Sequence, residues 1–201
     1  MATKLNTTQT MATNVITTGA KALKLAKPAH ILVTPYTADG VKGAKIYDLE
    51  DVIRDTVSVT QDDKNETDIE RETSDTPIYT ITTLGKYQFT ADVADTQTDL
   101  LADICGFTKD TDGKVYAPSA YKDLYAEVAV LFSNSGDTNY TALILPKLLL
   151  SSKATAESLN TNVAKITLSG TAQLAEITLK DNITKIKVPY YVDPEYTIPT
   201  A

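Results

Sequence analysis

The sequence predicts a mainly β protein: a β-sandwich or barrel with one flanking α-helix at about residues 95–105. Three observations support this fold class. Thr makes up 32 of 201 residues, and β-branched side chains suit half-buried strands. Several segments alternate between apolar and polar residues with period two, whereas one segment has helical spacing. At this length, with 42% hydrophobic residues, a single domain can bury a sizeable core.

The strand pattern recurs along the chain, with Gly, Pro, Asn and Asp between the segments. We expect strands at residues 30–36, 44–47, 55–60, 76–83, 86–93, 124–132, 139–150, 163–169, 172–179 and 183–191. Gly85 and Gly170 are each expected to mark the turn of a hairpin, and residues 151–162 to form a loop. Residues 110–113 (DTDG) are typical of another tight turn.

The helix is predicted from an apolar stripe and from its two ends. The stripe consists of Leu100, Leu101, Ile104 and Cys105. Asp95 or Thr96 is expected to supply the N-cap oxygen, and Asp99 lies in the first turn, where the helix dipole favours a carboxylate. Gly106 is expected to end the helix. So short a helix needs a sheet to pack against.

The domain organisation predicted from composition has three parts. Residues 1–28 are an extended basic N-terminal arm, residues 29–192 a single β-sandwich domain, and residues 193–201 a C-terminal tail extended by two prolines. A long polar loop, residues 61–75, is inserted in the domain. No segment has the apolar length of a membrane-spanning helix or of a secretory signal, so we expect a soluble protein without membrane contact.

The net charge of −7 is a difference between opposed blocks. Residues 48–75 carry eleven acidic and three basic side chains, a net charge of −8. Residues 1–45 have a net charge of +5 and residues 147–187 one of +3. Opposed blocks favour head-to-tail self-association, because complementary charge sets orientation and register. The alternative is ordinary solvated surface charge.

Enzyme chemistry has little support in the sequence. The phosphate-binding, nucleophile-elbow and zinc-protease motifs are absent, so we expect no catalytic residue, cofactor or metal. The single Cys105 lies on the apolar stripe and is interpreted as a buried hydrophobe, and the single His30 as a strand-edge residue. Asp110 and Asp112 indicate a turn rather than a calcium loop, which needs further acidic ligands. The overall acidity argues against sequence-specific nucleic-acid binding.

Two other function classes stay open. The acidic run could supply paired carboxylates to a hydrolase that acts on glycosides. The chain could also be another β-sandwich virion or binding module: a head–tail connector, a capsid decoration protein or an adhesin. A carbohydrate-binding adhesin is weakened by the absence of Trp, although eleven Tyr are present.

The order of features resembles the major tail tube proteins of long-tailed bacteriophages. The basic arm is followed by a strand and by DVIRDTVSVTQDD (residues 51–63). A polar loop leads to TPIYTITTLGKYQFTADV (residues 76–93) and at once to DTQTDLLADICGF (residues 95–107). Residues 76–107 carry most of the resemblance. The later YAEVAVLF, NYTALILPKLLLSS and ITLSGTAQLAEITL suit the rest of that fold.

The resemblance implies a structural virion protein without catalysis, made in the host bacterial cytoplasm. In that family, copies form hexameric rings whose inner sheets merge into a barrel around a channel, and the rings stack into a tube. The channel holds the tape measure protein and later passes DNA during genome ejection, and the tube ends meet tail terminator and baseplate proteins. Loops and arms connect successive rings.

The resemblance and the charge blocks together predict an inter-ring contact between acidic and basic residues. The residues of this contact are Asp62, Asp63, Glu66, Asp68, Glu70, Glu72, Lys21, Lys24 and Lys27. We expect residues 1–28 and 61–75 to be poorly ordered in a monomer and to become ordered when rings stack.

Overall fold

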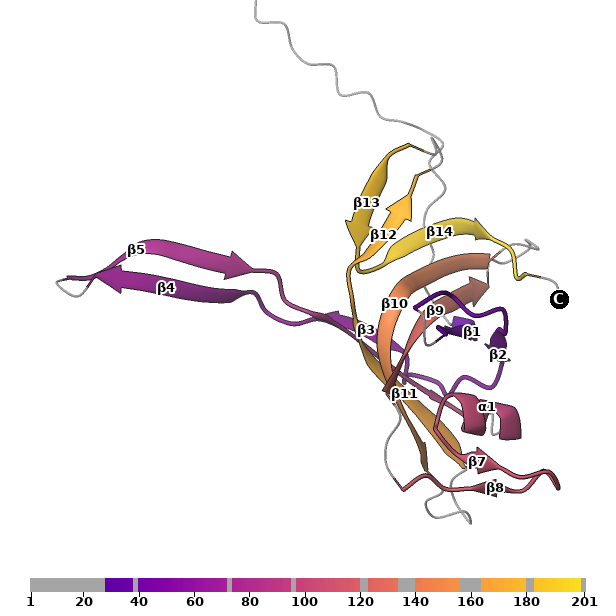
Figure 1. Cartoon of the computed structure of the whole chain (residues 1–201). Coiled ribbons are helices and arrows are strands. Elements are labelled where there is room, and N and C mark those ends of the chain that lie inside the picture. Colours follow the sequence, from indigo (N-terminus) through magenta and orange to yellow (C-terminus); the bar gives the residue numbers. More distant parts are fainter. Residues whose placement is uncertain are drawn as a thin grey trace, which may run out of the picture.

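The computed structural model describes residues 28–37, 40–71, 74–94, 97–119, 123–133, 140–155, 164–179 and 183–199. These residues form antiparallel strands and one short helix (Figure 1), which confirms the mainly β, sandwich-like fold class. The elements are β1 (Pro28–Pro35), β2 (Tyr47–Leu49), β3 (Ser58–Gln61), β4 (Asn65–Arg71), β5 (Ser74–Thr83), β6 (Tyr87–Val93), α1 (Thr98–Asp103), β7 (Thr108–Lys109), β8 (Val115–Tyr116), β9 (Asp123–Ser133), β10 (Tyr140–Thr155), β11 (Lys165–Ala172), β12 (Ala175–Thr178), β13 (Lys185–Val188) and β14 (Tyr191–Tyr196).

The main sheet has the order β2-β1-β9-β10-β11-β6-β3, with β14 also paired to β10. The long strand β10 changes partner along its length, because residues 140–144 pair with β14 and residues 148–155 with β11. The change falls at Pro146, where the pairing with β9 shifts by one residue between Leu145 and Leu148. Proline has no N–H to donate, so a bulge is the natural place for it in a strand. At this bulge the partner on that side of β10 changes from β14 to β11.

The core consists of two apolar clusters on opposite faces of β1, β9 and β10. Because side chains alternate along a strand, Ile31 and Val33 belong to the larger cluster and Leu32 to the smaller one. The larger cluster also contains Phe89 from β6 and Leu100 from α1, so the helix closes one side of it. In the smaller cluster, partly buried tyrosines of β10 and β14 cover the apolar residues.

Helix α1 is shorter than predicted, and its N-cap residue is Gln97, which makes no side-chain capping bond. Asp95 and Thr96 lie outside the described residues. Gly106 has a φ of +76°, which confirms its predicted place at the end of the helix. The stripe residue Ile104 is fully buried and its carbonyl accepts a hydrogen bond of 2.6 Å from Ser152 Oγ. Tertiary burial therefore holds a helix that its local sequence caps poorly.

Both hairpins predicted at glycines are wrong. Strand β11 runs straight through Gly170, and β5 pairs with β4 rather than with β6. A Cβ on Gly170 would lie 2.5 Å from the Leu149 carbonyl oxygen, and one on Gly85 would lie 1.8 Å from that of Asp62. These glycines therefore permit a close approach of two backbone segments, a role that sequence patterns do not distinguish from a turn.

The predicted polar loop, residues 61–75, is also wrong as a loop. Most of it is strand: it contains the end of β3, all of β4 and the start of β5. The β4–β5 pair projects far from the body of the molecule (Figure 1). The N-terminal residues 1–27 lie outside the described part of the chain. Strand β10 continues to Thr155, into the predicted 151–162 loop, and β14 continues to Tyr196, past the predicted start of the C-terminal tail.

Candidate functional site

Strands β4 and β5 form a two-stranded ribbon, the long ribbon, with two different faces. Thr67 lies opposite Ile81 and Ile69 opposite Tyr79, which places the apolar side chains on one face, the apolar face. The other face, the acidic face, holds Glu66 and Asp68 together with Thr80 and Thr82, which lie opposite them. The alternation of side chains along each strand thus makes the ribbon amphipathic.

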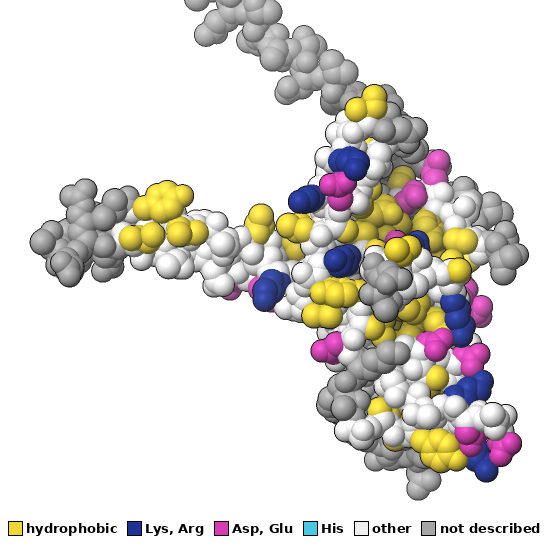
Figure 2. Space-filling model, viewed as in Figure 1, with side chains coloured by type: hydrophobic (Ala, Val, Ile, Leu, Met, Phe, Trp, Pro, Cys, Tyr) yellow, Lys and Arg dark blue, Asp and Glu magenta, His cyan; other side chains and the backbone are white. Residues whose placement is uncertain are grey.

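The apolar face of the long ribbon has no cover in the described residues. Ile69 is 46% exposed, Tyr79 63% and Ile81 42%, and Leu84 at the base of the ribbon is 83% exposed. Figure 2 shows hydrophobic side chains gathered on the projecting ribbon. A soluble monomer rarely exposes a contiguous apolar surface without a use for it, so this face is a candidate interface.

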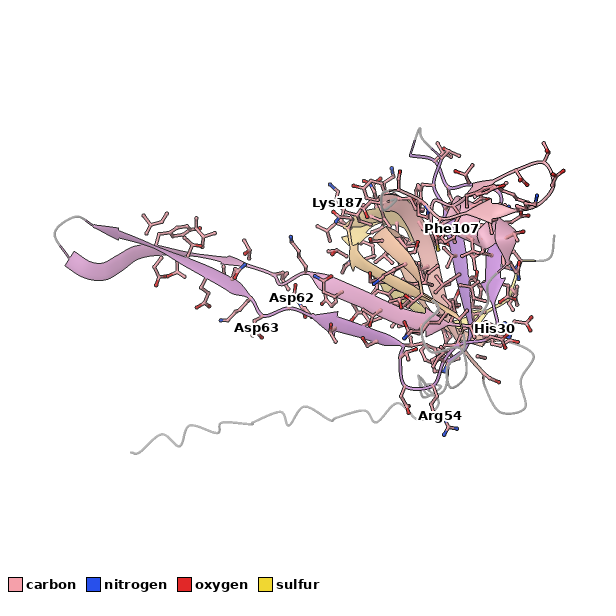
Figure 3. The ribbon with its side chains drawn as sticks, turned by 90° about the horizontal axis from the view of Figure 1, so that it is seen from below. His30, Arg54, Asp62, Asp63, Phe107 and Lys187 are labelled. Carbon is pink, nitrogen blue, oxygen red and sulfur yellow. The ribbon has the colours of Figure 1, made fainter. Side chains whose placement is uncertain are left out.

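The acidic face brings together part of the predicted contact. Asp68 accepts a hydrogen bond of 2.6 Å from Thr80, and Glu66 pairs with Lys64 at 2.5 Å. Asp62 and Asp63 lie at the neck where the ribbon leaves the body (Figure 3), and Asp62 accepts a bond from the Gln88 amide.

The other predicted contact residues are not placed together by the structure. Glu70 belongs to β4, but its side chain is not among those described. Glu72, Lys21, Lys24 and Lys27 lie outside the described residues. A contact between the lysines and the acidic face therefore stays a prediction.

Strands β12 and β13 form a second amphipathic ribbon, the short ribbon, which sequence reasoning missed. Ile177 lies opposite Ile186 on one face, and Glu176 opposite Lys187 on the other. Lys185 also lies on the charged face, 2.8 Å from Glu176, and its hydrogen bond lowers the pKa of that carboxyl. The signal that could have found this ribbon is the alternation in AEIT, which is predicted above as part of a hairpin about Gly170, and in KIKV, which is predicted as part of the last strand, residues 183–191.

The two ribbons hold most of the exposed apolar surface. Of the twelve large hydrophobic residues described as exposed, eight lie in the ribbons or directly beside their strands. They are Ile69, Tyr79, Ile81, Leu84, Leu174, Leu179, Ile183 and Ile186. The body itself buries its apolar residues well, so exposure is concentrated where the chain projects.

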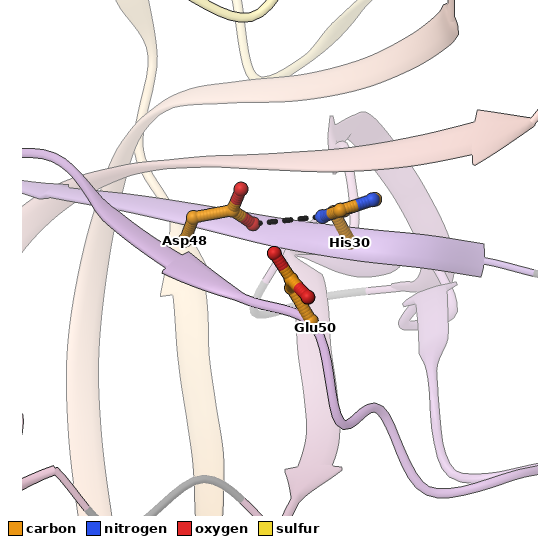
Figure 4. Close-up of side chains that lie close together, drawn as sticks. All are labelled: His30, Asp48 and Glu50. Carbon is orange, nitrogen blue, oxygen red and sulfur yellow. Dashed lines mark hydrogen bonds and ion pairs between the residues drawn. The ribbon is translucent and has the colours of Figure 1, made fainter. Parts of the chain in front are cut away.

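His30 has an acidic neighbour that the sequence did not indicate. Strand β2 pairs with β1 and brings Asp48 Oδ1 to 2.9 Å from His30 Nδ1, with Glu50 close by (Figure 4). The ring also packs edge-on against Tyr140. These three side chains could offer a cation one nitrogen and two oxygens. The short His30–Asp48 contact also links β1 to β2 directly, and this link needs no cation.

The remaining candidate residues of the sequence have structural roles. Cys105 is buried in the larger core cluster, as predicted. The Asp110 carboxylate accepts hydrogen bonds from the backbone N–H groups of Asp112 and Lys114, and Gly113 has a φ of +82°. This confirms the turn between β7 and β8.

The geometry of the acidic run offers little to a hydrolase. Asp62, Asp63, Glu66 and Asp68 are all exposed. Glu66 and Asp68 lie on a ribbon two strands wide, which forms no wall around them, and Asp62 and Glu66 already have partners in Gln88 and Lys64. Hydrolysis of a glycoside needs two carboxyl groups that flank a bound sugar.

The comparisons with known proteins add one distant likeness. No protein-family model matches the chain, and no curated protein matches it. A solved structure, the six-fold symmetrised cryo-EM structure of the anti-feeding prophage (AFP) baseplate, is similar over 85% of this chain and 97% of that chain. The sequence identity is 10% and the TM-score 0.36, a level at which the likeness carries no argument about function. Within the described residues, no helix combines the length and apolar character needed to cross a membrane.

Proposed function

We propose that this chain is a self-assembling structural subunit of a virion, and that it builds the tail tube of a long-tailed phage. The observation that carries the proposal is the long ribbon. Within the described residues neither of its faces is buried, although Ile69, Tyr79 and Ile81 line one of them. An isolated two-stranded ribbon is marginal in water, so a contact with another copy is the simplest way to stabilise it.

The edges of the sheets support the same proposal. Strands β2 and β3 end the main sheet, and the long and short ribbons each have two edges that pair with no other described strand. Open edges invite pairing with further chains. Closure of copies into a ring covers such edges and explains why a structural subunit keeps them.

The finer features of the proposal come from the sequence resemblance. Six copies form a ring, rings stack into a hollow tube, and the tube contains the tape measure protein before DNA passes through it. A net charge of −7 per copy suits a channel for DNA, because like charge prevents phosphates from adhering to the wall. Terminator and baseplate proteins are the partners proposed at the two ends.

The predicted inter-ring contact is part of this proposal. The carboxylates of the long ribbon would meet Lys21, Lys24 and Lys27 of a copy in the next ring. Asp62 and Asp63 lie at the neck, and Glu66 and Asp68 lie on the acidic face, where Lys64 pairs with Glu66.

Electron microscopy and light scattering of the purified protein, from dilute to concentrated solution, test the proposal. We expect rings at intermediate concentration and open-ended tubes at high concentration. A single ring size that never stacks would indicate a connector. Monomers under all conditions would contradict the proposal, and specific hits on a glycan array would then favour an adhesin.

Replacement of Asp62, Asp63, Glu66 and Asp68 by the corresponding amides separates the structural proposal from the hydrolase alternative. We expect impaired assembly of the purified variant. A hydrolytic activity that is present in the parent protein and lost in this variant would instead support the enzyme.

A further inference from the structure

We propose that the outer edge of β4 in one copy pairs with the outer edge of β13 in a second copy. This inference rests on the self-assembly of the proposed function and names the two surfaces that meet. It assigns Glu66 and Asp68 to the lysines of β13 in place of the N-terminal lysines, which leaves Asp62 and Asp63 to the arm. The long ribbon of one subunit would thus add two strands to the short ribbon of its neighbour, and the two ribbons would become one four-stranded sheet.

The two ribbons have free edges and the same pattern of faces. Each is a two-stranded sheet whose members pair with no further described strand. In each, one face is apolar and the other carries charge and Thr. Edge-to-edge pairing keeps side chains of one kind on one side of the joined sheet, which is the condition for a stable register.

The apolar faces gain most from this joining. Ile69 lies opposite Tyr79 in the long ribbon, and Ile177 lies opposite Ile186 in the short one. Side by side, they form a continuous apolar surface across four strands. Neighbouring side chains on one face of a sheet shield each other from water, which reduces the exposed area of both ribbons.

Charge selects which edges meet. Of the acidic side chains that the structure describes in the long ribbon, Glu66 and Asp68 both lie on β4, and the positions opposite them on β5 are threonines. In the short ribbon both lysines, Lys185 and Lys187, are on β13, whereas β12 carries Glu176. Among the four possible edge pairs, β4 against β13 alone places two carboxylates beside two ammonium groups on one face.

Charge also selects the symmetry of the contact. Pairing of β4 with β4 of another copy would place four carboxylates together, and pairing of β13 with β13 would place four lysines together. Both symmetric arrangements are repulsive. The favoured contact joins two different surfaces and leaves one of each kind free, so it continues from copy to copy until a ring closes or a filament grows.

Charge exchange between the two edges tests the proposal. One variant carries Glu66→Lys with Asp68→Lys, a second carries Lys185→Glu with Lys187→Glu, and a third combines all four. The combined variant has the net charge of the parent chain. All four side chains are exposed, so the variants should fold, and circular dichroism with thermal unfolding verifies this.

We expect each single-edge variant to assemble only at a concentration higher by about tenfold or more, since two attractive cross-strand pairs become repulsive. The combined variant should assemble like the parent, because the charges are again opposite. Two controls change the net charge equally at exposed sites in the body: Asp51→Lys with Asp112→Lys, and Lys114→Glu with Lys153→Glu. Both controls should assemble normally.

The outcomes separate this inference from the proposed function. If the parent protein forms no assembly, the proposed function fails. If the parent assembles but single-edge variants behave like their controls, or the combined variant is not rescued, the β4–β13 contact is wrong while self-assembly stands. Rescue of Glu66→Lys/Asp68→Lys by Lys21, Lys24 and Lys27→Glu instead would assign the acidic face to the N-terminal arm.

Discussion

Gly170 lies in the middle of β11, where β10 and β11 approach each other closely. A Cβ at this position would meet the Leu149 carbonyl oxygen at 2.5 Å and Leu148 Cγ at 2.9 Å. Neither atom can move without displacing a central strand or a fully buried side chain. The residue thus shows that a glycine between two apolar runs can mark close packing rather than a turn.

We predict that Gly170→Ala lowers the free energy of unfolding by ~1–3 kcal/mol, the usual cost of overpacking a core. Urea denaturation followed by circular dichroism measures the change. Thr178→Ala, at an exposed strand position, is the control and should change the free energy much less. If Gly170→Ala lowered the free energy of unfolding no more than Thr178→Ala does, the close approach of β10 and β11 at Gly170 would not matter for stability.

Asp92 is the partly buried carboxylate with the best-defined partners. Lys165 Nζ lies 2.5 Å and Thr167 Oγ1 2.6 Å from its oxygens. Burial by itself raises the pKa of this carboxyl, but the two hydrogen bonds outweigh the burial and hold the pKa below its ordinary value. The charged form of Asp92 therefore stabilises the contact between β6 and β11.

This lowered pKa predicts a loss of stability in acid. The contribution is fully present above the unfolded-state pKa of about 4 and is lost as the pH falls through the lower folded-state value. We expect Asp92→Asn to be less stable than the parent at pH 6, with the difference shrinking towards pH 3. Unfolding free energies across this range test it, and a difference independent of pH would contradict the assignment.

The long ribbon is an element that the core does not need. Among the side chains that the structure describes, neither core cluster includes a residue of β4 or β5. We predict that replacement of residues 64–84 by a short Gly–Ser turn changes the unfolding free energy of the body by less than ~1 kcal/mol. The same deletion should abolish rings and tubes in electron micrographs. A body that fails to fold without the ribbon would contradict this division of roles.

The apolar face of the ribbon should matter for assembly and not for the monomer. We predict that Tyr79→Ser with Ile81→Ser raises the concentration needed for assembly, because exposed side chains contribute little to the fold of a single chain. Thr80→Ser with Thr82→Ser, on the opposite face, is the matched control. Light scattering measures assembly, and thermal unfolding of the dilute protein verifies that the fold is unchanged.

The whole molecule combines separate regions of opposite charge with exposed apolar faces. The part of assembly that depends on charge should weaken with salt, whereas the part that depends on apolar contact should not. The Debye length falls from ~10 Å at 0.1 M salt to ~3 Å at 1 M, which screens contacts between exposed charges. We predict weaker assembly of the parent in high salt. The Glu66→Lys/Asp68→Lys variant should improve with salt, since screening relieves its repulsion. If the concentration needed for assembly did not change with salt in either protein, the contact would depend on apolar packing alone.

Much of the body could be predicted, because each of its main strands is an apolar run that is recognisable without knowing its partner. The segments around Leu32, Val130 and Ile144 combine apolar runs with polar boundaries, and each is a strand in the structure. The helix was predicted from its stripe and from Gly106, although its first residue differs. The acidic residues of the predicted contact were chosen by charge alone; the structure places Glu66 and Asp68 on one face of the long ribbon, and the contact itself stays a prediction.

The choice of partner for each strand was decided only by the tertiary structure. A loop is predicted at residues 61–75 because they have no apolar run, yet the cross-strand pairs of Ile69 with Tyr79 and of Thr67 with Ile81 belong to a ribbon. The short ribbon was missed because its alternation is brief and because Gly170 suggested a different turn. Local composition and periodicity specify a β-rich chain with opposed charge blocks and with a helix before Gly106. Strand pairing joins residues that are far apart in the chain, and it depends on close approaches and burial. For this reason only the fold shows that Glu66 and Asp68 lie on β4, at the edge of one projecting ribbon, and that Lys185 and Lys187 lie on β13, at the edge of the other.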